Sequence, residues 1–198
     1  MFRYFIIYKP YQVLSQFSAH EDKRTLKDFF PVPSDVYSIG RLDYDSEGLL
    51  IFTNDKQLNH RLLNPLFSHE REYWVQVEGA IPQNAIHKLE EGVYIGIDGK
   101  SYRTNKCRAE IFTETPGVPE RIPPVRFRKN IPTSWIKLIL TEGKNRQVRK
   151  MTASIGYPTL RLIRTRIEKI NLYPLQIGKM RELSGDEIYS KLFPGETT

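Results

Sequence analysis

Short apolar runs and alternating apolar positions along the chain predict many strands. Residues 2–8, which contain the apolar run of residues 4–8, are predicted to form a first strand that stops at Lys9-Pro10. Residues 72–78 alternate, with Tyr73, Val75 and Val77 on one face. The other predicted strands are residues 37–42, 49–53, 103–112, 134–141 and 161–171, with a hairpin turn at Asp98-Gly99.

Capping residues, prolines and glycines indicate where the helices begin and end. Asn54 is expected to cap a helix that ends before Asn64-Pro65. Ser184 and Glu187 match a capping box at the start of a terminal helix. The other predicted helical segments are residues 25–30, 82–91 and 146–155. Because strands and helices do not alternate regularly, we expect an α+β fold with a mixed, mostly antiparallel sheet and flanking helices.

The longest segment without a predicted helix or strand is residues 114–132. It contains five prolines and the basic stretch Arg126-Phe127-Arg128-Lys129. Loops of this length are usually functional or disordered, and the basic stretch favours a function. No repeat or linker interrupts the chain, so its 198 residues are expected to form a single domain, residues 1–198, with two lobes possible.

Composition places the chain among folded proteins and narrows its chemistry. It is 39% hydrophobic and 27% charged, and its single cysteine, Cys107, excludes an intramolecular disulfide framework and a cysteine-based zinc cluster. The apolar runs are too short to span a bilayer, and no signal peptide is apparent at the N-terminus. We therefore expect a cytoplasmic protein without a membrane partner.

Charge is distributed unevenly along the sequence. The net charge is +7, but residues 121–166 contain twelve Lys and Arg and a single acidic residue, Glu142. The rest of the chain has 18 basic and 22 acidic residues. A basic segment next to an acidic remainder favours binding to a polyanion, most commonly a nucleic acid. The alternative is a solvated basic surface without a ligand.

Several common catalytic patterns are missing. The four histidines have no metal-ligand spacing, so no metal site is expected. The segment Thr141-Glu142-Gly143-Lys144 resembles part of a phosphate-binding loop but lacks its first glycine and the following Ser or Thr. No G-x-S-x-G elbow occurs. Hydrolase and nucleotidase functions therefore have little support.

Two clusters of charged residues are candidates for chemistry. An acidic turn at residues 40–48 places Asp43, Asp45 and Glu47 between two predicted strands, where a carboxylate can be held on a rigid frame. A basic cluster at residues 143–151 places four cations at a strand-to-helix junction suited to phosphate. Each has a simpler interpretation, a solvated polar turn for the first and an ordinary basic helix face for the second.

Together the two clusters resemble a known family. The segment Gly40-Arg41-Leu42-Asp43-x-Asp45-Ser46-Glu47-Gly48 is similar to the catalytic motif of RsuA-type RNA pseudouridine synthases. Lys9-Pro10 and Tyr73-Trp74-Val75 occupy the expected positions before and after it, and residues 142–151 are similar to the third motif. Residues 131–135 and 158–164 resemble the subgroup that acts on large-subunit (23S) ribosomal RNA. Departures are small: Ser46 stands where threonine is usual, and Arg71 where lysine is common.

This resemblance, which covers nearly the whole chain, implies a pseudouridine synthase fold with a central RNA-binding cleft. It implies isomerisation of a specific uridine in 23S ribosomal RNA, by base flipping and a rearrangement of the glycosidic bond, without cofactor or metal. Asp43 would be the catalytic carboxylate, Arg149 would pair with it, and Tyr73 would stack on the target base. Many relatives carry an N-terminal S4 domain; because the first predicted strand begins at Phe2, we expect none here, and we expect a monomer. The implied RNA-binding residues are Arg41, Arg126, Arg128, Lys129, Lys144, Arg146, Lys150, Arg161 and Arg164.

Two alternatives remain at this stage. The same chemistry can act on another ribosomal or transfer RNA uridine. A non-catalytic RNA-binding protein with the same fold would also explain the charge, but it leaves the joint presence of Asp43, Tyr73 and Arg149 without a reason.

Overall fold

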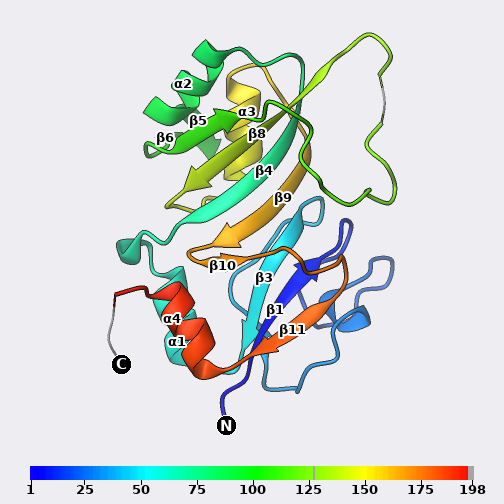
Figure 1. Ribbon diagram of the computed structural model, residues 1–198, viewed down its shortest axis with the longest axis vertical. Coiled ribbons are helices and arrows are strands. Elements are labelled where there is room, and N and C mark those ends of the chain that lie inside the picture. Colours follow the sequence, from blue (N-terminus) through cyan, green and yellow to red (C-terminus); the bar gives the residue numbers. More distant parts are fainter. Residues whose placement is uncertain (127, 196–198) are drawn as a thin grey trace. The chain divides into compact units, whose positions relative to one another are not determined.

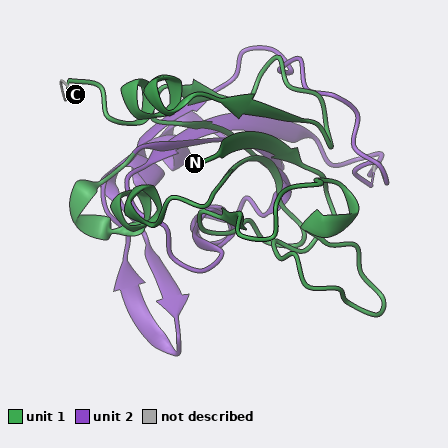
Figure 2. Cartoon of the chain, turned by 90° about the horizontal axis from the view of Figure 1, so that it is seen from below, with its two compact units in different colours: residues 1–69, 163–198 green, residues 70–162 purple. Residues whose placement is uncertain are grey.

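The computed structural model describes residues 1–126 and 128–195. The chain divides into two compact units: Met1–His69 with Ile163–Thr198 form unit 1, and Glu70–Leu162 form unit 2 (Figure 2). The chain leaves unit 1 after His69 and returns to it within strand β9 (Thr159–Ile167).

Unit 1 is built on a sheet in the order β11-β1-β3-β9 (Figure 1). Strand β1 (Tyr4–Lys9) pairs antiparallel with β11 (Met180–Leu183) and β3 (Glu47–Thr53), whereas β3 pairs parallel with β9. Every residue of β1 and β3 is buried, which explains the apolar runs of residues 4–8 and 49–52 within them. Two short strands complete the sheet, β2 (Tyr37–Ser38) on β3 and β10 (Ile170–Asn171) on β9.

The helices of unit 1 are η1 (Leu26–Asp28), α1 (Lys56–Leu63), η2 (Pro65–Phe67) and α4 (Gly185–Leu192). The prediction that Asn54 caps α1 is wrong, because the carboxylate of Asp55 accepts the backbone N–H groups of Gln57 and Leu58. Asp55 is also the acceptor for the hydroxyls of Tyr4 and Tyr189, at 2.9 and 2.6 Å. These four bonds hold a buried carboxylate at the start of α1.

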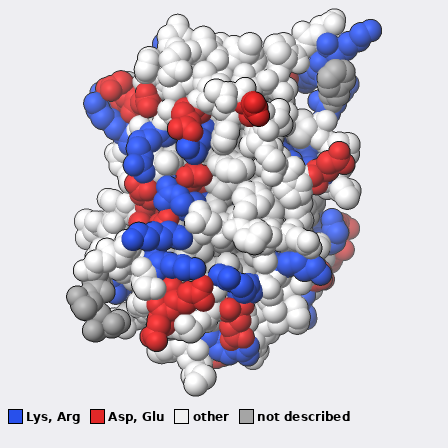
Figure 3. All heavy atoms as spheres, in the orientation of Figure 1, with Lys and Arg blue, Asp and Glu red and all other residues white. Residues whose placement is uncertain are grey.

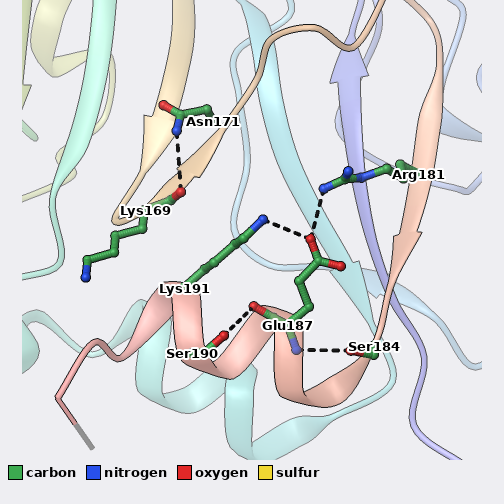
Figure 4. Close-up of polar contacts among 7 residues, drawn as sticks. All are labelled: Lys169, Asn171, Arg181, Ser184, Glu187, Ser190 and Lys191. Carbon is green, nitrogen blue, oxygen red and sulfur yellow. Dashed lines mark hydrogen bonds and ion pairs between the residues drawn. The ribbon is translucent and has the colours of Figure 1, made fainter.

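At the start of α4, half of the expected capping box is present (Figure 4). The hydroxyl of Ser184 accepts the backbone N–H of Glu187 at 3.0 Å. The Glu187 carboxylate, however, receives Lys191 at 2.8 Å and Arg181 at 3.1 Å. Two nearby cations therefore hold this carboxylate, which a capping box would direct to the backbone of Ser184.

Unit 2 contains an antiparallel sheet of β4 (Arg71–Glu78), β8 (Thr133–Leu140) and β7 (Arg108–Ile111), with β8 in the middle. The predicted alternation of β4 is confirmed, since Tyr73, Val75 and Val77 are buried in the core of this unit. Helices α2 (Gln83–Glu91) and α3 (Gln147–Ser154) complete that core.

Strands β5 (Tyr94–Ile97) and β6 (Lys100–Arg103) form a separate two-stranded sheet in unit 2 (Figure 1). Asp98 and Gly99 connect them with φ of +48° and +78°, which confirms the predicted hairpin turn. The prediction for residues 103–112 is corrected in extent, because β6 ends at Arg103 and β7 begins only at Arg108.

The expected α+β fold with a mostly antiparallel sheet is confirmed. The predicted strand at residues 37–42 is shorter than expected, because Gly40 takes φ of +68° and turns the chain away from β3. In the described part of residues 114–132 there is no helix or strand, as predicted. Among the described residues, no helix has the length and apolar character to cross a bilayer.

Candidate active site

The acidic turn connects β2 to β3 in unit 1, and backbone hydrogen bonds fix it on both sides. The N–H of Ser46 bonds to the carbonyl of Asp43 at 3.0 Å, and the N–H of Gln12 bonds to the carbonyl of Tyr44 at 2.9 Å. The hydroxyl of Ser15 donates to the carbonyl of Leu42 at 2.6 Å and accepts its N–H at 3.1 Å. Asp43 is thus presented, half-buried, from a fixed backbone.

The acidic turn ends at Gly48, a position where no side chain can be accommodated. Gly48 has φ of +114°, and a Cβ atom there would lie 2.3 Å from the carbonyl oxygen of Arg164. At this point β3 and β9 pair in parallel, with Gly48 opposite Arg164. Glycine therefore allows the close approach of backbones that joins the acidic turn to β9.

A buried lysine lies at the end of β1, opposite Gly48 of the acidic turn. Lys9 is 0% exposed, and its Nζ donates to the carbonyl of Pro10 at 2.9 Å. Burial lowers the pKa of Lys9 to about 7, although the negative charges of Glu47, Asp45 and Asp43 act in the opposite direction. The sequence motifs include Lys9 in the Lys9-Pro10 pair but assign it no chemical role. The available signal was a cation at the end of an otherwise apolar strand.

Two arginines expected to bind RNA are buried on β9. Arg161 and Arg164 are each 5% exposed. The Nε of Arg164 donates to the carbonyl of Leu49 at 2.8 Å, so its guanidinium supports the backbone of β3. A guanidinium with so little exposed surface offers little to a phosphate, and RNA contact by these residues stays a prediction.

The other two expected catalytic residues belong to unit 2. Tyr73 lies on β4 opposite Leu138 and is 8% exposed. Arg149 lies in the first turn of α3, is half-buried, and its Nη1 donates to the carbonyl of Thr159 at 3.5 Å. Both side chains are thus held by regular elements of the unit.

A buried carboxylate, Glu142, organises the basic loop, residues 143–146, that precedes α3. Glu142 accepts the hydroxyl of Tyr102 at 2.5 Å, the N–H of Asn105 at 2.9 Å and the amide Nε2 of Gln147 at 2.6 Å. The hydrogen bond to Glu142, with burial, raises the pKa of Tyr102 to about 12. Gln147 in turn accepts the N–H of Lys144 at 2.9 Å. The single acid of the basic segment therefore shapes the loop that presents the cations.

The cations of the basic cluster, residues 143–151, are not equally exposed. Lys144 and Arg146 are exposed, whereas Lys150 is half-buried. Arg146 precedes α3 with φ of +53°, so it begins the helix as a left-handed residue rather than as its first helical residue. The cations on the loop are thus exposed to solvent, and phosphate binding by them stays a prediction.

Two arginines attach the proline-rich loop, residues 114–132, to the rest of unit 2. Arg121 donates to the carbonyls of Pro123, Pro124 and Leu160, and Arg128 pairs with Glu78 at 3.0 Å. A cavity of about 190 Å³ is lined by residues that include Arg126, Arg128 and Gln76. Phe127, in the middle of the basic stretch, lies outside the described residues. Arg126, Lys129 and, on the acidic turn, Arg41 are exposed.

Over the face drawn in Figure 3, Lys and Arg side chains are interspersed with Asp and Glu. This face therefore has no extended region of one sign. Within the described residues, no group of three or more His, Cys, Asp and Glu side chains is placed to hold a metal ion.

Comparison with known proteins agrees with these features. The RNA pseudouridylate synthase family matches residues 3–154. A Vibrio parahaemolyticus protein named ribosomal large subunit pseudouridine synthase E is 47% identical over 178 residues, 90% of this chain and 72% of the relative. A Xanthomonas axonopodis protein of the same name is 48% identical over 164 residues, 82% of this chain and 84% of the relative.

A solved structure supports the same assignment. A crystal structure of a pseudouridylate synthase has a TM-score of 0.78 and 28% identity, covering 97% of this chain and 74% of the other. The family match spans the acidic turn, β4 and α3 with its basic loop, the three places that the sequence motifs marked. This chain therefore belongs to the family of RNA pseudouridine synthases, enzymes that isomerise uridine within RNA.

Proposed function

We propose that this chain converts a uridine of large-subunit ribosomal RNA to pseudouridine, with Asp43, Tyr73 and Arg149 as its catalytic residues. The observation that carries the proposal is the acidic turn, where a fixed backbone presents Asp43 between β2 and β3. The relatives named for large-subunit ribosomal RNA, nearly half identical over most of the chain, favour this substrate.

The reaction breaks the bond from N1 of uracil to the sugar and forms a bond from C5 to the same sugar carbon. The proton leaves C5 and the ring nitrogen regains one, so no atom is gained or lost. One carboxylate is sufficient because no water is activated, in contrast to the paired carboxylates of glycoside hydrolysis. Asp43 is the residue that we assign to this step.

Arg149 and Tyr73 have complementary roles in the proposal. We assign Arg149 as the partner that keeps Asp43 ionised and oriented, since an adjacent cation favours a charged carboxylate. We assign Tyr73 to stacking on the uracil ring once the base has left its helix. The place of Arg149 on α3 and of Tyr73 in the core of unit 2 supports these roles, because both are held by rigid elements.

RNA binding is assigned to exposed cations, which would offset the cost of base flipping, roughly a few kcal/mol, through phosphate contacts. The acidic turn contributes Arg41 and the basic loop contributes Lys144 and Arg146, all exposed. The proline-rich loop contributes Arg126 and Lys129, with Arg128 exchanging its ion pair with Glu78 for a phosphate.

The test measures tritium release from 23S ribosomal RNA labelled at C5 of uracil, followed by mapping of the modified position. Asp43→Asn should abolish release while keeping the fold and RNA affinity, because it removes a charge and preserves size. Asp45→Asn, in the same turn, is the matched control and should keep turnover well above that variant. Arg149→Ala should lower the rate even with saturating RNA.

Pseudouridine formation by Asp43→Asn at more than a trace of the parent rate would refute the catalytic assignment. Mapping to a transfer RNA or a small-subunit position, with 23S RNA unmodified, would refute the substrate assignment alone.

A further inference from the structure

The β5–β6 hairpin of unit 2 has an inner face in the core and an outer face with an exposed aromatic ring. Ile95 pairs with Tyr102 on the inner face, and Ile95 is 5% exposed. Tyr94 pairs with Arg103 on the outer face, and Tyr94 is 66% exposed. The guanidinium carbon of Arg103 lies 6.0 Å from the centroid of the Tyr94 ring. An aromatic ring and a cation are therefore presented side by side.

The surroundings of Tyr94 leave its ring accessible. Gly96 and Ser101 form the next pair on the outer face, and both are exposed. A Cβ added at Gly96 would meet no atom within 4 Å. Arg103 donates to the carbonyl of Glu91 at 3.5 Å, which uses one of the five N–H donors of its guanidinium. The ring is thus open to a flat ligand and Arg103 retains donors for an anion.

The hairpin is connected to the helix that carries Arg149. The hydroxyl of Tyr102 bonds to Glu142, which also binds Gln147 in the first turn of α3. The Nζ of Lys144 lies 5.0 Å from the centroid of the Tyr102 ring, and β5 packs against α3. Glu142 and Lys144 therefore join the hairpin to the proposed RNA-binding loop and to the first turn of α3, within one unit.

The chemistry of this face fits RNA better than a protein partner. A protein contact built on Tyr94 would need further apolar side chains around it, and the neighbouring pair is a glycine and a serine. Residues 94–106 carry three cations, Lys100, Arg103 and Lys106, against one acid, Asp98. The Nζ of Lys144, from the basic loop, adds a fourth cation over the ring of Tyr102. An exposed ring beside cations is the arrangement that binds unpaired nucleotides.

We propose that Tyr94 and Arg103, on the outer face of the β5–β6 hairpin, bind an unpaired nucleotide of the substrate RNA. The base stacks on the ring of Tyr94, and Arg103 contacts a neighbouring phosphate. The proposal rests on RNA as the substrate, as proposed above, but not on the roles of Asp43, Tyr73 and Arg149. The hairpin thus adds a stacking contact to phosphate binding and favours RNA with an unpaired segment beside the target.

The test measures RNA affinity of the full chain by fluorescence anisotropy. The probes are a single-stranded fragment of large-subunit ribosomal RNA and a blunt duplex of the same length. Tyr94→Ala should weaken single-strand binding by about 5- to 150-fold, the range expected for one stacked base, with a smaller effect on the duplex. Tyr94→Phe keeps the ring and should bind like the parent. Arg103→Ala should flatten the slope of log affinity against log salt by about 0.7.

The matched control is Arg24→Ala in unit 1. Arg24 is an exposed cation whose guanidinium carbon lies 5.2 Å from the centroid of Phe29, so this variant removes the same kind of contact elsewhere. It should leave single-strand affinity unchanged. In turnover assays, Tyr94→Ala should raise KM and leave kcat unchanged at saturating RNA, because the ring is assigned to binding.

Parental affinity of Tyr94→Ala for the single strand, with an unchanged circular dichroism spectrum and melting temperature, would overturn the proposal. An equal loss on single strand and duplex would also overturn it, because stacking needs an unpaired base. A parent protein that binds neither RNA would refute the proposed function as well. Weakened binding by Tyr94→Ala alongside a fully active Asp43→Asn would support the hairpin while refuting the catalytic assignment.

Discussion

Replacing Lys9 by methionine tests whether burial or the nearby carboxylates control the charge of this lysine. Lys9 is fully buried, and burial lowers its pKa from 10.5 to about 7. The charges of Glu47, Asp45 and Asp43 favour the ammonium but are outweighed, and Arg164 opposes it. In the unfolded chain the lysine regains its ordinary pKa of about 10.4.

The sign of the pH dependence follows from this difference. Between about pH 7 and 10.5 the unfolded chain holds a proton on Lys9 that the folded chain has lost, so the free energy of unfolding rises with pH. This contribution is complete above pH 10.5 and disappears as pH falls through about 7. The full slope is about 1.4 kcal/mol per pH unit. Because the lysine is half-protonated at pH 7, the gain from about pH 7 to about pH 9 is about 2 kcal/mol.

Urea unfolding of the parent and of Lys9→Met at pH 7 and pH 9 measures this effect. Methionine has a similar length and does not titrate, so the parent should gain about 2 kcal/mol relative to the variant over this range. Lys88→Met, at an exposed position on α2, controls for the removal of an ammonium in general. A difference between parent and Lys9→Met that does not change with pH would mean that the carboxylates keep Lys9 charged, and our reasoning from burial would be refuted.

Three further substitutions test the remaining assignments. Tyr73→Leu should lose about 1–3 kcal/mol of base stacking, whereas Tyr73→Phe keeps stacking; equal, near-normal pseudouridine formation by both would remove Tyr73 from the site. Gly48→Ala should destabilise unit 1 by at least about 1–3 kcal/mol, since its Cβ would meet the Arg164 backbone; urea unfolding checks this against Gly143→Ala, whose Cβ meets nothing within 4 Å. The third variant replaces the three cations of the proline-rich loop, Arg126, Arg128 and Lys129, by alanine. It should bind RNA more weakly and with a flatter salt dependence, with little effect on the rate at saturating RNA. Parental affinity at every salt concentration would contradict this.

Local patterns predicted most of the secondary structure, because the elements concerned are determined by their own residues. The buried run of β1 and the alternation of β4 depend on neighbouring positions along one strand. The Asp98-Gly99 turn depends on two residues that tolerate positive φ. The N-cap of α1 was assigned to the wrong residue because Asn54 and Asp55 are both of a type that caps helices. Distant tyrosines, Tyr4 and Tyr189, bond to Asp55 and are invisible to local patterns.

The proposed site shows the same limit. Asp43 is proposed from a contiguous motif, whereas the groups that surround and fix this turn come from distant parts of the chain. Ser15 fixes Leu42 across 27 positions, and Lys9 of β1 interacts electrostatically with the carboxylates of the turn. Glu142 had a visible signal, as the only acid in a basic segment, and its contacts with Tyr102 and Gln147 show why an acid is there. Sequence reasoning finds the presented group more easily than the groups that hold it.

The charge of residues 121–166 overstates the number of phosphate contacts that this segment offers. Arg161 and Arg164 are buried, and Arg164 holds the backbone of β3. Arg128 and Lys137 pair with Glu78 and Glu110, acids of β4 and β7 that lie outside this segment. Acidic residues from outside residues 121–166 therefore neutralise part of this segment's charge directly. A count of charges along the sequence does not reveal these pairs. A binding surface with fewer available cations gains from contacts that do not depend on charge. The exposed ring on the β5–β6 hairpin supplies such a contact, and stacking there would persist at salt concentrations that weaken phosphate binding.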